Sequence, residues 1–355
     1  MNLIIPAAGR STRFPNVRPK WLLTHPNGNL MITEAIKGLN LSDLDRIYMV
    51  VLKEHLDRYQ FKEGLEKQID KIGQLEKFKL IVLEDDTKHQ PETIAMAIKK
   101  ENIKGQIFVK DTDNYYLHKI EKGNYLTTFS LNDLDMVNPR NKSYVTTDEN
   151  NMVLNIAEKK VISDVFSVGG YAFADAEQFL DYYQQLQDEK GLYVSHIIYK
   201  MLLDNISFEA KECKNYQDWG TSKDWNKFKK QYNTLFVDID GILVVNSAPH
   251  FPPYWGETKG IKENIEILTK LYDTGKVQII LTTSRTSAVK DITERQLERE
   301  GMKYHQIIYN LYHAKRIIIN DFAASNPYKS CDAINLKRNS TELREMLEEA
   351  LDINF

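Results

Sequence analysis

The first twenty residues constrain the fold of this chain more than any other stretch. Leu3 to Pro6 is an apolar run with the length of one buried strand. The next positions are small residues and cations, with no acidic residue before Glu34: Ala7, Ala8, Gly9, Arg10, Arg13, Arg18 and Lys20. This order predicts a phosphate-binding loop, because small residues let the backbone approach an anion that N–H and guanidinium groups then bind. The alternative is a surface loop with solvated arginine side chains.

Length and composition indicate a soluble protein with two domains. The chain has 355 residues, of which 42% are apolar and 27% charged. Its net charge of −3 gives no field that would attract nucleic acid or a membrane, and no apolar run approaches the ~18 residues of a membrane span. Cys213 and Cys331 form no metal-binding or disulfide pattern, and a predicted strand begins the chain. We therefore expect a cytoplasmic protein with reduced thiols and no signal peptide.

Strand-like and helical stretches alternate after the first loop. Ile47 to Leu52, Phe78 to Leu83 and Ile107 to Val109 are rich in β-branched and apolar residues, whereas Glu54 to Lys77 has helical composition. The alternation predicts an α/β fold with a mostly parallel sheet and helices on both faces. Ligands bind beyond the carboxyl ends of the strands in such sheets, and the next two motifs both lie there.

The second motif is the segment from Thr87 to Thr93, which contains His89 and Gln90 and leads into a helical stretch. On residues alone it is equally well a helix N-cap region. The third motif contains Asp111, Asp113 and Asn114 directly after a strand. Two carboxylates two residues apart at a strand end can both reach a hard cation. The alternative is an Asx turn that closes the strand.

These motifs resemble those of the sugar-phosphate nucleotidyltransferases. The signature loop of that family corresponds to Pro6-Ala7-Ala8-Gly9-Arg10-Ser11-Thr12-Arg13 followed by Pro19-Lys20, with Ser11 in place of its second glycine. The resemblance implies that Arg13 and Lys20 are catalytic and that the nucleotide is bound by a set of seven residues: Ala7, Ala8, Gly9, Arg10, Ser11, Gln90 and Asp111. Gln90 corresponds to the glutamine that reads the nucleobase.

The same resemblance extends to three later motifs. Glu158-Lys159-Lys160 and the strand containing Gly170 correspond to the part of the family that binds the acceptor, with Lys160 in place of a proline. Asp113 and Asp218 correspond to its two Mg²⁺ ligands. The reaction implied is attack of an acceptor phosphate on the α-phosphorus of a nucleoside triphosphate, with release of pyrophosphate. Lys159 would hold the acceptor phosphate.

A second domain is predicted to begin after a polar and basic stretch, giving domains 1–232 and 233–355. Its first strand, Thr234 to Val237, ends in Asp238-Ile239-Asp240-Gly241. This pattern resembles haloacid dehalogenase-like (HAD-like) phosphohydrolases, in which Asp238 would be the nucleophile and Asp240 the general acid and base. A hairpin turn is the alternative.

The supporting motifs of that second family follow in order. Thr283, at the end of a strand from Val277 to Leu281, would steady the phosphoryl group. Lys315, with Arg316 as its rival, would offset the charge of an aspartyl-phosphate. A strand from Ile317 to Ile319 would lead to Asp321, which would complete a Mg²⁺ site with Asp238 and Asp240. Asn320 stands where the family often has another acid.

The sequence as a whole predicts a bifunctional enzyme with two Rossmann-like α/β domains: a GT-A-like nucleotidyltransferase fold followed by a HAD-like fold. Its partners would be Mg²⁺, a nucleoside triphosphate and a sugar phosphate or similar acceptor, with no nucleic acid or membrane. The phosphatase would act in the same pathway as the transferase, and we expect that pathway to be the synthesis of surface polysaccharide precursors. One alternative is a CTP-dependent transferase for alditol or choline phosphate whose second domain is a non-catalytic scaffold. Another is a nucleotide-binding regulatory protein. Homo-oligomerisation is left open.

Overall fold

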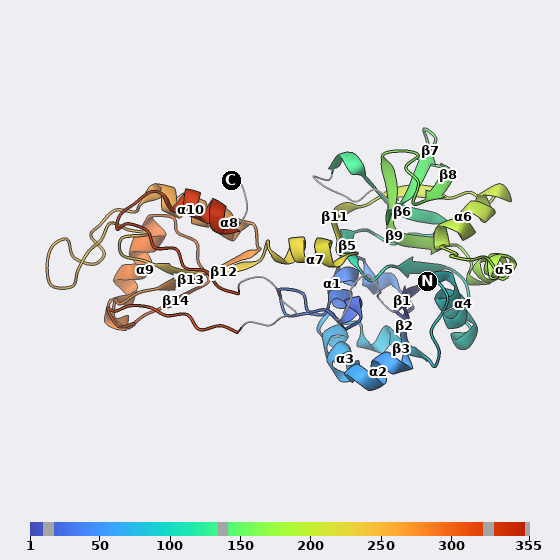
Figure 1. Cartoon of the computed structure of the whole chain (residues 1–355), viewed down its shortest axis with the longest axis horizontal. Coiled ribbons are helices and arrows are strands. Elements are labelled where there is room, and N and C mark those ends of the chain that lie inside the picture. The colour runs from blue at the N-terminus through green and yellow to red at the C-terminus, as the bar shows by residue number, and fades with distance from the viewer. Residues whose placement is uncertain (10–17, 134–140, 322–329, 352–355) are drawn as a thin grey trace. The chain divides into compact units, whose positions relative to one another are not determined.

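The structure is a computed structural model that describes residues 1–9, 18–133, 141–321 and 330–351. The chain divides into two compact units, Met1–Trp225 and Asn226–Phe355 (Figure 1). The division lies within helix α7 (Ser222–Lys229), a few residues before the boundary expected from the sequence.

The first unit is built on a mixed sheet of nine strands in the described residues, and seven of them follow the order β10-β6-β9-β4-β1-β2-β3. The strands are β1 (Asn2–Pro6), β2 (Arg46–Leu52), β3 (Phe78–Leu83), β4 (Ile107–Lys110), β6 (Tyr125–Ser130), β7 (Ser143–Thr147), β8 (Val153–Glu158), β9 (Val165–Phe173) and β10 (Glu209–Glu212). The four strands from β3 to β4 are parallel, and Leu3 pairs with both Ile47 and Phe108. Beyond β4 the order becomes antiparallel at β9 and β6. The α/β prediction is confirmed, with the parallel part centred on β1.

Helices pack against this sheet through apolar faces. They are α1 (Met31–Lys37), α2 (Lys53–Tyr59), α3 (Lys62–Lys71), α4 (Gln90–Glu101), α5 (Ala176–Leu186) and α6 (Val194–Leu203), with short 3-10 helices η1 (Lys20–Leu22), η2 (Leu41–Asp43), η3 (Leu75–Lys77) and η4 (Leu131–Asp133). Figure 1 shows α4, α5 and α6 together along one side of the unit. Ile94, Phe179 and Ile198, one from each of these helices, are fully buried in the main core. The predicted helical stretch after β2 is divided between α2 and α3.

A two-stranded ribbon joins segments that are far apart in the sequence. It consists of β5 (Asn114–Leu117) and β11 (Lys214–Asp218), which pair antiparallel with Asp218 opposite Asn114. β5 begins four residues after the end of β4, at Asn114, so the ribbon carries the third motif of the sequence next to Asp218.

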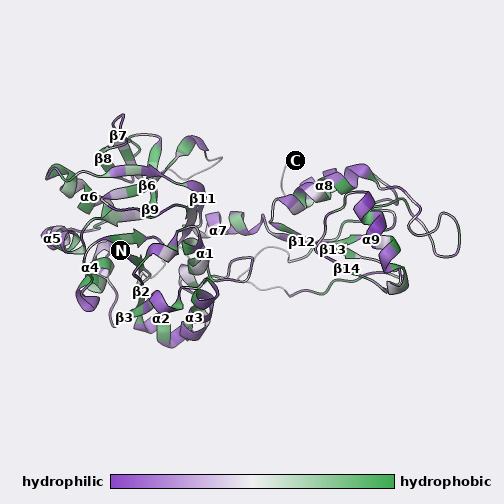
Figure 2. Cartoon of the chain, turned by 180° about the vertical axis from the view of Figure 1, so that it is seen from behind, coloured by the Kyte–Doolittle hydropathy of each residue, from purple (hydrophilic) through white to green (hydrophobic). Residues whose placement is uncertain are grey.

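The second unit is a smaller parallel sheet in the order β12-β13-β14. Its elements are β12 (Asn233–Asp238), α8 (Lys262–Asp273), β13 (Val277–Thr282), η6 (Ser287–Val289), α9 (Lys290–Arg299), β14 (Gln306–Ile308) and α10 (Leu343–Leu351). Helices α8 and α9 are the crossovers between successive strands, as right-handed βαβ connections require. Much of α9 is hydrophilic (Figure 2). Its Leu297 side chain is fully buried in the core of this unit.

The predicted strand from Ile317 to Ile319 is wrong. These residues form no helix or strand, and their side chains are 75%, 53% and 92% exposed. β-branched residues favour strands because they pack on neighbouring strands, and this run has no such packing.

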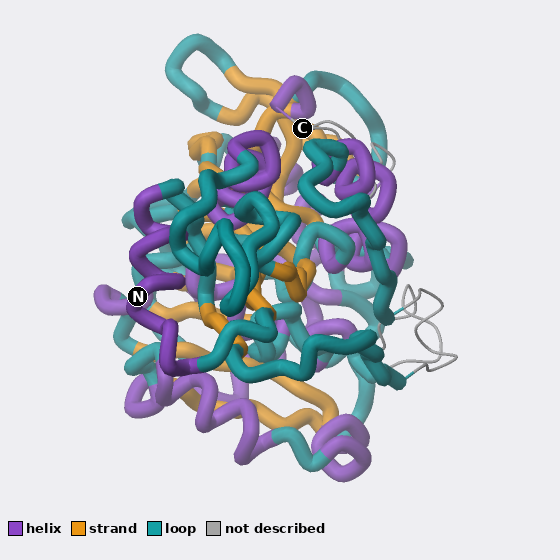
Figure 3. Tube along the Cα trace, turned by 90° about the vertical axis from the view of Figure 1, so that its left-hand side faces the viewer, coloured by secondary structure: helices purple, strands orange, loops and turns teal. Residues whose placement is uncertain are grey.

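Figure 3 distinguishes strands, helices and loops along the trace. None of the helices within the described ranges is long and apolar enough to span a bilayer. Cys213 is buried and Cys331 exposed, and both are free thiols.

Candidate functional site

The loop after β1 begins as the sequence predicts. Ala7 and Ala8 are buried, and the Ala7 N–H donates to the carbonyl oxygen of Val50 on β2 at 2.8 Å. Gly9 is exposed, and a Cβ atom built there would have no atom of the described residues within 4 Å. The predicted nucleotide contacts of Arg10, Ser11 and Arg13 lie outside the described residues.

Lys20 and Asp113 form an ion pair in this region. Lys20 begins η1, whereas Asp113 follows β4, and the two side chains are only 15% and 11% exposed. Screening by water is weak at this burial, so the pair is stronger than a surface salt bridge. The cation at the end of the first motif and the carboxylate of the third motif therefore meet at the carboxyl end of the sheet.

The ribbon β5–β11 brings Asp218 to the same place. Asp218 stands opposite Asn114, and the N–H of Trp219 donates to the carbonyl oxygen of Asp113 at 2.9 Å. The backbones of both predicted metal ligands therefore adjoin, although more than a hundred residues separate them.

The donor set suits Mg²⁺, because two carboxylates and additional ligands from substrate phosphates and water are its usual coordination in phosphoryl-transfer sites. The described residues contain no group of three or more His, Cys, Asp or Glu side chains that could hold a metal ion by themselves. A cation here would thus depend on Asp113, Asp218 and non-protein oxygen atoms.

Lys142 is a residue of this site that the sequence did not single out. Its Nζ donates to the carboxylate of Asp218 and, at 2.6 Å, to the hydroxyl oxygen of Tyr216. The ammonium also lies 5.4 Å from the ring centroid of Phe166, within cation–π range. Each predicted metal ligand therefore has one lysine partner. Only the position of Lys142 at the start of β7 could have drawn attention to it, and that signal is weak.

Gln90 and Asp111 meet beside the loop. The Nε2 of Gln90, the first residue of α4, donates to the Asp111 carboxylate, and the Asp111 N–H donates to the carbonyl oxygen of Gly169 at 2.8 Å. Burial, together with the negative charge of Asp113, raises the pKa of Asp111 to about 6. The carboxylate occupies the space where a side chain at position 169 would lie, and Gly169 has a φ of +80°. The predicted nucleotide-binding side chains are thus already joined to each other.

The predicted acceptor residues lie on β8 and β9. Glu158 accepts hydrogen bonds from the hydroxyl groups of Ser143 and Ser195, the latter at 2.8 Å. Lys159 is exposed with a φ of +55°, and its Nζ lies 4.3 Å above the ring of Tyr193 and donates to the hydroxyl of that residue. Because the Lys159 side chain is exposed, its ammonium group is accessible to an anion.

Gly170 is held in a different environment from its neighbour. A Cβ atom there would collide with the hydroxyl groups of Tyr116 and Thr127. The small residue is therefore required by packing inside the sheet, and the structure gives it no open space for a sugar.

Comparison of the sequence with models of protein families and with curated proteins gives no match. Solved structures do match. A nucleoside-diphosphate-sugar pyrophosphorylase from Vibrio cholerae RC9 superposes with a TM-score of 0.54 and 19% identity, covering 64% of this chain and 98% of that one. A protein from Bacillus anthracis assigned as a glucose-1-phosphate thymidylyltransferase, solved in complex with sucrose, gives 0.51 and 19%, covering 64% and 92%. The N-terminal region has the pyrophosphorylase fold.

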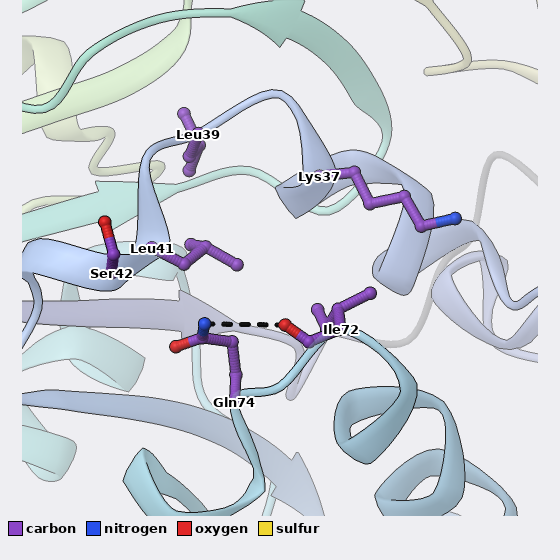
Figure 4. A pocket seen from close by; sticks show the side chains of 6 residues that line it. All are labelled: Lys37, Leu39, Leu41, Ser42, Ile72 and Gln74. Atoms are coloured by element: carbon purple, nitrogen blue, oxygen red, sulfur yellow. Dashed lines mark hydrogen bonds between the residues drawn. The ribbon is translucent and has the colours of Figure 1, made fainter.

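The candidate site lies at the carboxyl ends of the parallel strands, where Lys20, Asp113 and Asp218 meet. An open pocket elsewhere on the unit does not belong to it. That pocket, of about 350 Å³, is lined by Lys37, Leu39, Leu41, Ser42, Ile72 and Gln74 (Figure 4). The Nε2 of Gln74 donates to the carbonyl oxygen of Ile72 at 3.4 Å across its floor. No residue predicted to bind a substrate lines this pocket.

In the second unit, Asp238 and Asp240 follow β12 as predicted, and each has an arginine partner. Arg285 is fully buried and donates to both carboxylate oxygens of Asp240, from Nε at 2.8 Å and from a terminal nitrogen at 2.7 Å. Ser247 donates to the same carboxylate at 2.9 Å. Arg316 donates to Asp238 at 3.1 Å. Burial raises the pKa of Asp238, against the opposing effect of Arg316.

The remaining predicted residues of this unit are not all brought together. Thr283 is buried after β13, and its hydroxyl oxygen accepts the N–H of Arg285 at 3.1 Å. Lys315 is exposed, and the contact with Asp238 expected of it is made by Arg316. Asp321 lies in an exposed segment, where its carbonyl oxygen accepts the hydroxyl of Ser330. Arg285, which the sequence did not single out, is the functional residue that was missed in this unit.

Proposed function

We propose that the first unit transfers a nucleotidyl group from a nucleoside triphosphate to a small phosphorylated acceptor and releases pyrophosphate. The observation that carries this proposal is the meeting of Asp113, Asp218 and Lys20 beyond the carboxyl ends of β1 and β4. The pyrophosphorylase fold supports it, because ligands of open α/β sheets bind at this edge.

In the proposed reaction, an acceptor phosphate oxygen forms a bond to the α-phosphorus while the bond to the leaving pyrophosphate oxygen breaks. No covalent enzyme intermediate is needed, so the protein acts by positioning and by offsetting charge. Lys20 and Arg13 would hold the triphosphate and Lys159 the acceptor phosphate. Asp113 and Asp218 would hold Mg²⁺, which supplies neutralisation of the charge that develops on the phosphates.

The acceptor we propose first is a sugar 1-phosphate. Two of the solved structures with this fold carry the names nucleoside-diphosphate-sugar pyrophosphorylase and glucose-1-phosphate thymidylyltransferase. Alditol and choline phosphates remain the next acceptors to test, and the nucleobase is left to experiment. A product of this kind would be a precursor for surface polysaccharide.

The test is pyrophosphate release in the presence of Mg²⁺, across five nucleoside triphosphates combined with sugar, alditol and choline phosphates. Asp113→Asn and Asp218→Asn should each abolish turnover, whereas Asp181→Asn on the exposed face of α5 should keep it. Triphosphate binding without pyrophosphate release in any combination would favour the regulatory alternative instead.

For the second unit we propose a phosphate monoester site at Asp238. At the end of β12, the carboxylate of Asp240 contacts Arg285 and that of Asp238 contacts Arg316. Asp238 could then act as the nucleophile toward a phosphoryl group, with Asp240 as its acid–base partner. Mg²⁺-dependent hydrolysis and non-hydrolytic binding are the two candidate activities. Arg316 would contact the phosphoryl group in either case, because it already lies at Asp238.

Replacement of Asp238 by asparagine separates these candidates. Hydrolysis predicts release of inorganic phosphate by the wild type and by Glu266→Gln, an exposed control on α8, but not by Asp238→Asn. Unchanged nucleotidyl transfer in all three proteins would show that the two sites act separately. A wild type that binds phosphosugars at this unit without releasing phosphate would establish the binding module.

A further inference from the structure

Lys110 is buried where the fold has no need of a charge. It is the last residue of β4, and its side chain has no exposed surface. The preceding residues of the strand, Ile107 to Val109, are apolar and fully buried. A buried ammonium is unfavourable unless its N–H groups find acceptors, and an apolar side chain would continue the pattern of the strand without that cost. Lys110 therefore needs an explanation beyond packing.

Within the described part of the chain, the ammonium donates to the loop that follows β4 and to the first residue of β5. Its Nζ lies 2.8 Å from the carbonyl oxygen of Asp111, 3.0 Å from that of Asn114, and 2.5 Å from Oδ1 of Asn114. A lysine ammonium has three donors, so these three acceptors satisfy it completely. The ring of Tyr116 lies 4.6 Å away and adds a cation–π contact. The lysine thus fixes both ends of the Asp111-Thr112-Asp113 turn.

The residues that Lys110 fixes are those on which the candidate metal ligands depend. Asn114 is the first residue of β5 and pairs with Asp218 on β11. The carbonyl group of Asp113 accepts the N–H of Trp219, the residue after Asp218. A loop that shifted at Asn114 would therefore move Asp113 directly and Asp218 through the ribbon.

We propose that Lys110 is a positioning residue for the two-carboxylate site, acting from the end of β4 through residues 111–114. The effect of Lys110 on metal binding rests on the proposed function, whereas its effect on the loop does not. Lys110 touches no substrate in this arrangement.

Two variants and one control test this role in the full-length protein. Lys110→Met keeps the length of the side chain and removes the donors. Asn114→Ala removes the side-chain amide, which contains only one of the three acceptors of the ammonium, and serves if the methionine variant fails to fold. Ile198→Ala, at a core position of α6, is the control that lowers stability away from the loop. Affinity for Mn²⁺ alone is measured by electron paramagnetic resonance. Amide hydrogen exchange of residues 111–114 and 218–220 is measured without metal.

We expect Lys110→Met to lower Mn²⁺ affinity at least tenfold and to accelerate exchange at least tenfold in both segments, with smaller changes of the same kind in Asn114→Ala. Ile198→Ala should leave both quantities within twofold of the wild type. Wild-type affinity and wild-type exchange in a folded Lys110→Met protein, or in Asn114→Ala if the first variant does not fold, would overturn the proposal. Failure of the wild type to bind Mn²⁺ would count against the proposed function, and the exchange result would then decide the role of Lys110. Equal acceleration in Ile198→Ala would show that Lys110 acts only through global stability, and would also overturn the proposal.

Discussion

Replacement of His118 by glutamine should remove a large part of the acid sensitivity of the first unit. The ring of His118 stacks on Phe108 with centroids 5.9 Å apart, and its Nε2 lies 3.1 Å from the hydroxyl oxygen of Tyr125. Burial lowers the pKa of His118 from 6.5 to about 4. Because the pKa is lower in the folded protein, only the unfolded chain takes up a proton between these values. Stability is therefore complete above about pH 6.5 and is lost as the pH falls toward 4.

The size of the effect follows from the shift. One pKa unit corresponds to about 1.4 kcal/mol, so the whole shift corresponds to roughly 3 kcal/mol. Between pH 7.5 and pH 4.5 the loss is roughly 2.5 kcal/mol, since the folded protein is itself partly protonated at the lower pH. His118→Gln loses the ring contacts at every pH but has no group that titrates in this range. The difference in unfolding free energy between wild type and variant should therefore shrink by roughly 2.5 kcal/mol on acidification.

Urea denaturation followed by tryptophan fluorescence can measure this difference. In a Trp255→Phe background the remaining tryptophans are Trp21, Trp219 and Trp225, all buried in the first unit. The signal then reports this unit alone, whatever the second unit does. A difference that stays constant within about 0.5 kcal/mol between the two pH values, the size of an ordinary surface substitution, would refute the reasoning.

Three further substitutions give measurable expectations. Arg285→Met leaves the Asp240 carboxylate without its guanidinium partner and should destabilise the second unit by roughly 3–5 kcal/mol in urea denaturation followed by Trp255 fluorescence. Arg285→Lys should recover only part of that stability, because an ammonium does not reproduce the bidentate contact. Gly169→Ala adds a side chain at a positive φ against the Asp111 carboxylate, and should cost at least ~1 kcal/mol of first-unit stability in urea denaturation of the Trp255→Phe background. Ile319→Thr alters an exposed side chain and should change stability by less than about 0.5 kcal/mol; a larger loss would mean that the run from Ile317 is buried in solution.

The parts of the fold that the sequence predicts well are those with local causes. The apolar runs at β1 to β4 are buried strands because their side chains have no polar group to satisfy, and the turn residues after each strand end it. The same reasoning failed at Ile317 to Ile319, where a β-branched run has no neighbouring strand to pack on. A preference for strand becomes a strand only when pairing is available, and pairing is not a local property.

The same distinction between local and non-local causes applies to the residues of the candidate site. Lys20, Gln90, Asp111 and Asp113 could be selected because they follow strands, where parallel sheets bind ligands. Lys142 and Arg285 could not, since a lysine or arginine in a polar stretch resembles any solvated cation until the tertiary structure buries it against a carboxylate. The choice between Lys315 and Arg316 likewise depends on where one loop turns.

The pairing of β5 with β11 also has a consequence in time. Asn114 and Asp218 are 104 positions apart (218 minus 114), so the ribosome must add that many residues before the two strands can meet. At a synthesis rate of about 5–20 residues per second, β5 waits roughly 5–20 seconds with an unpaired edge. The nascent chain therefore acquires the four parallel strands β1 to β4 well before it acquires the ribbon, and any protein released before Lys214 has been added would lack β11 and Asp218 altogether.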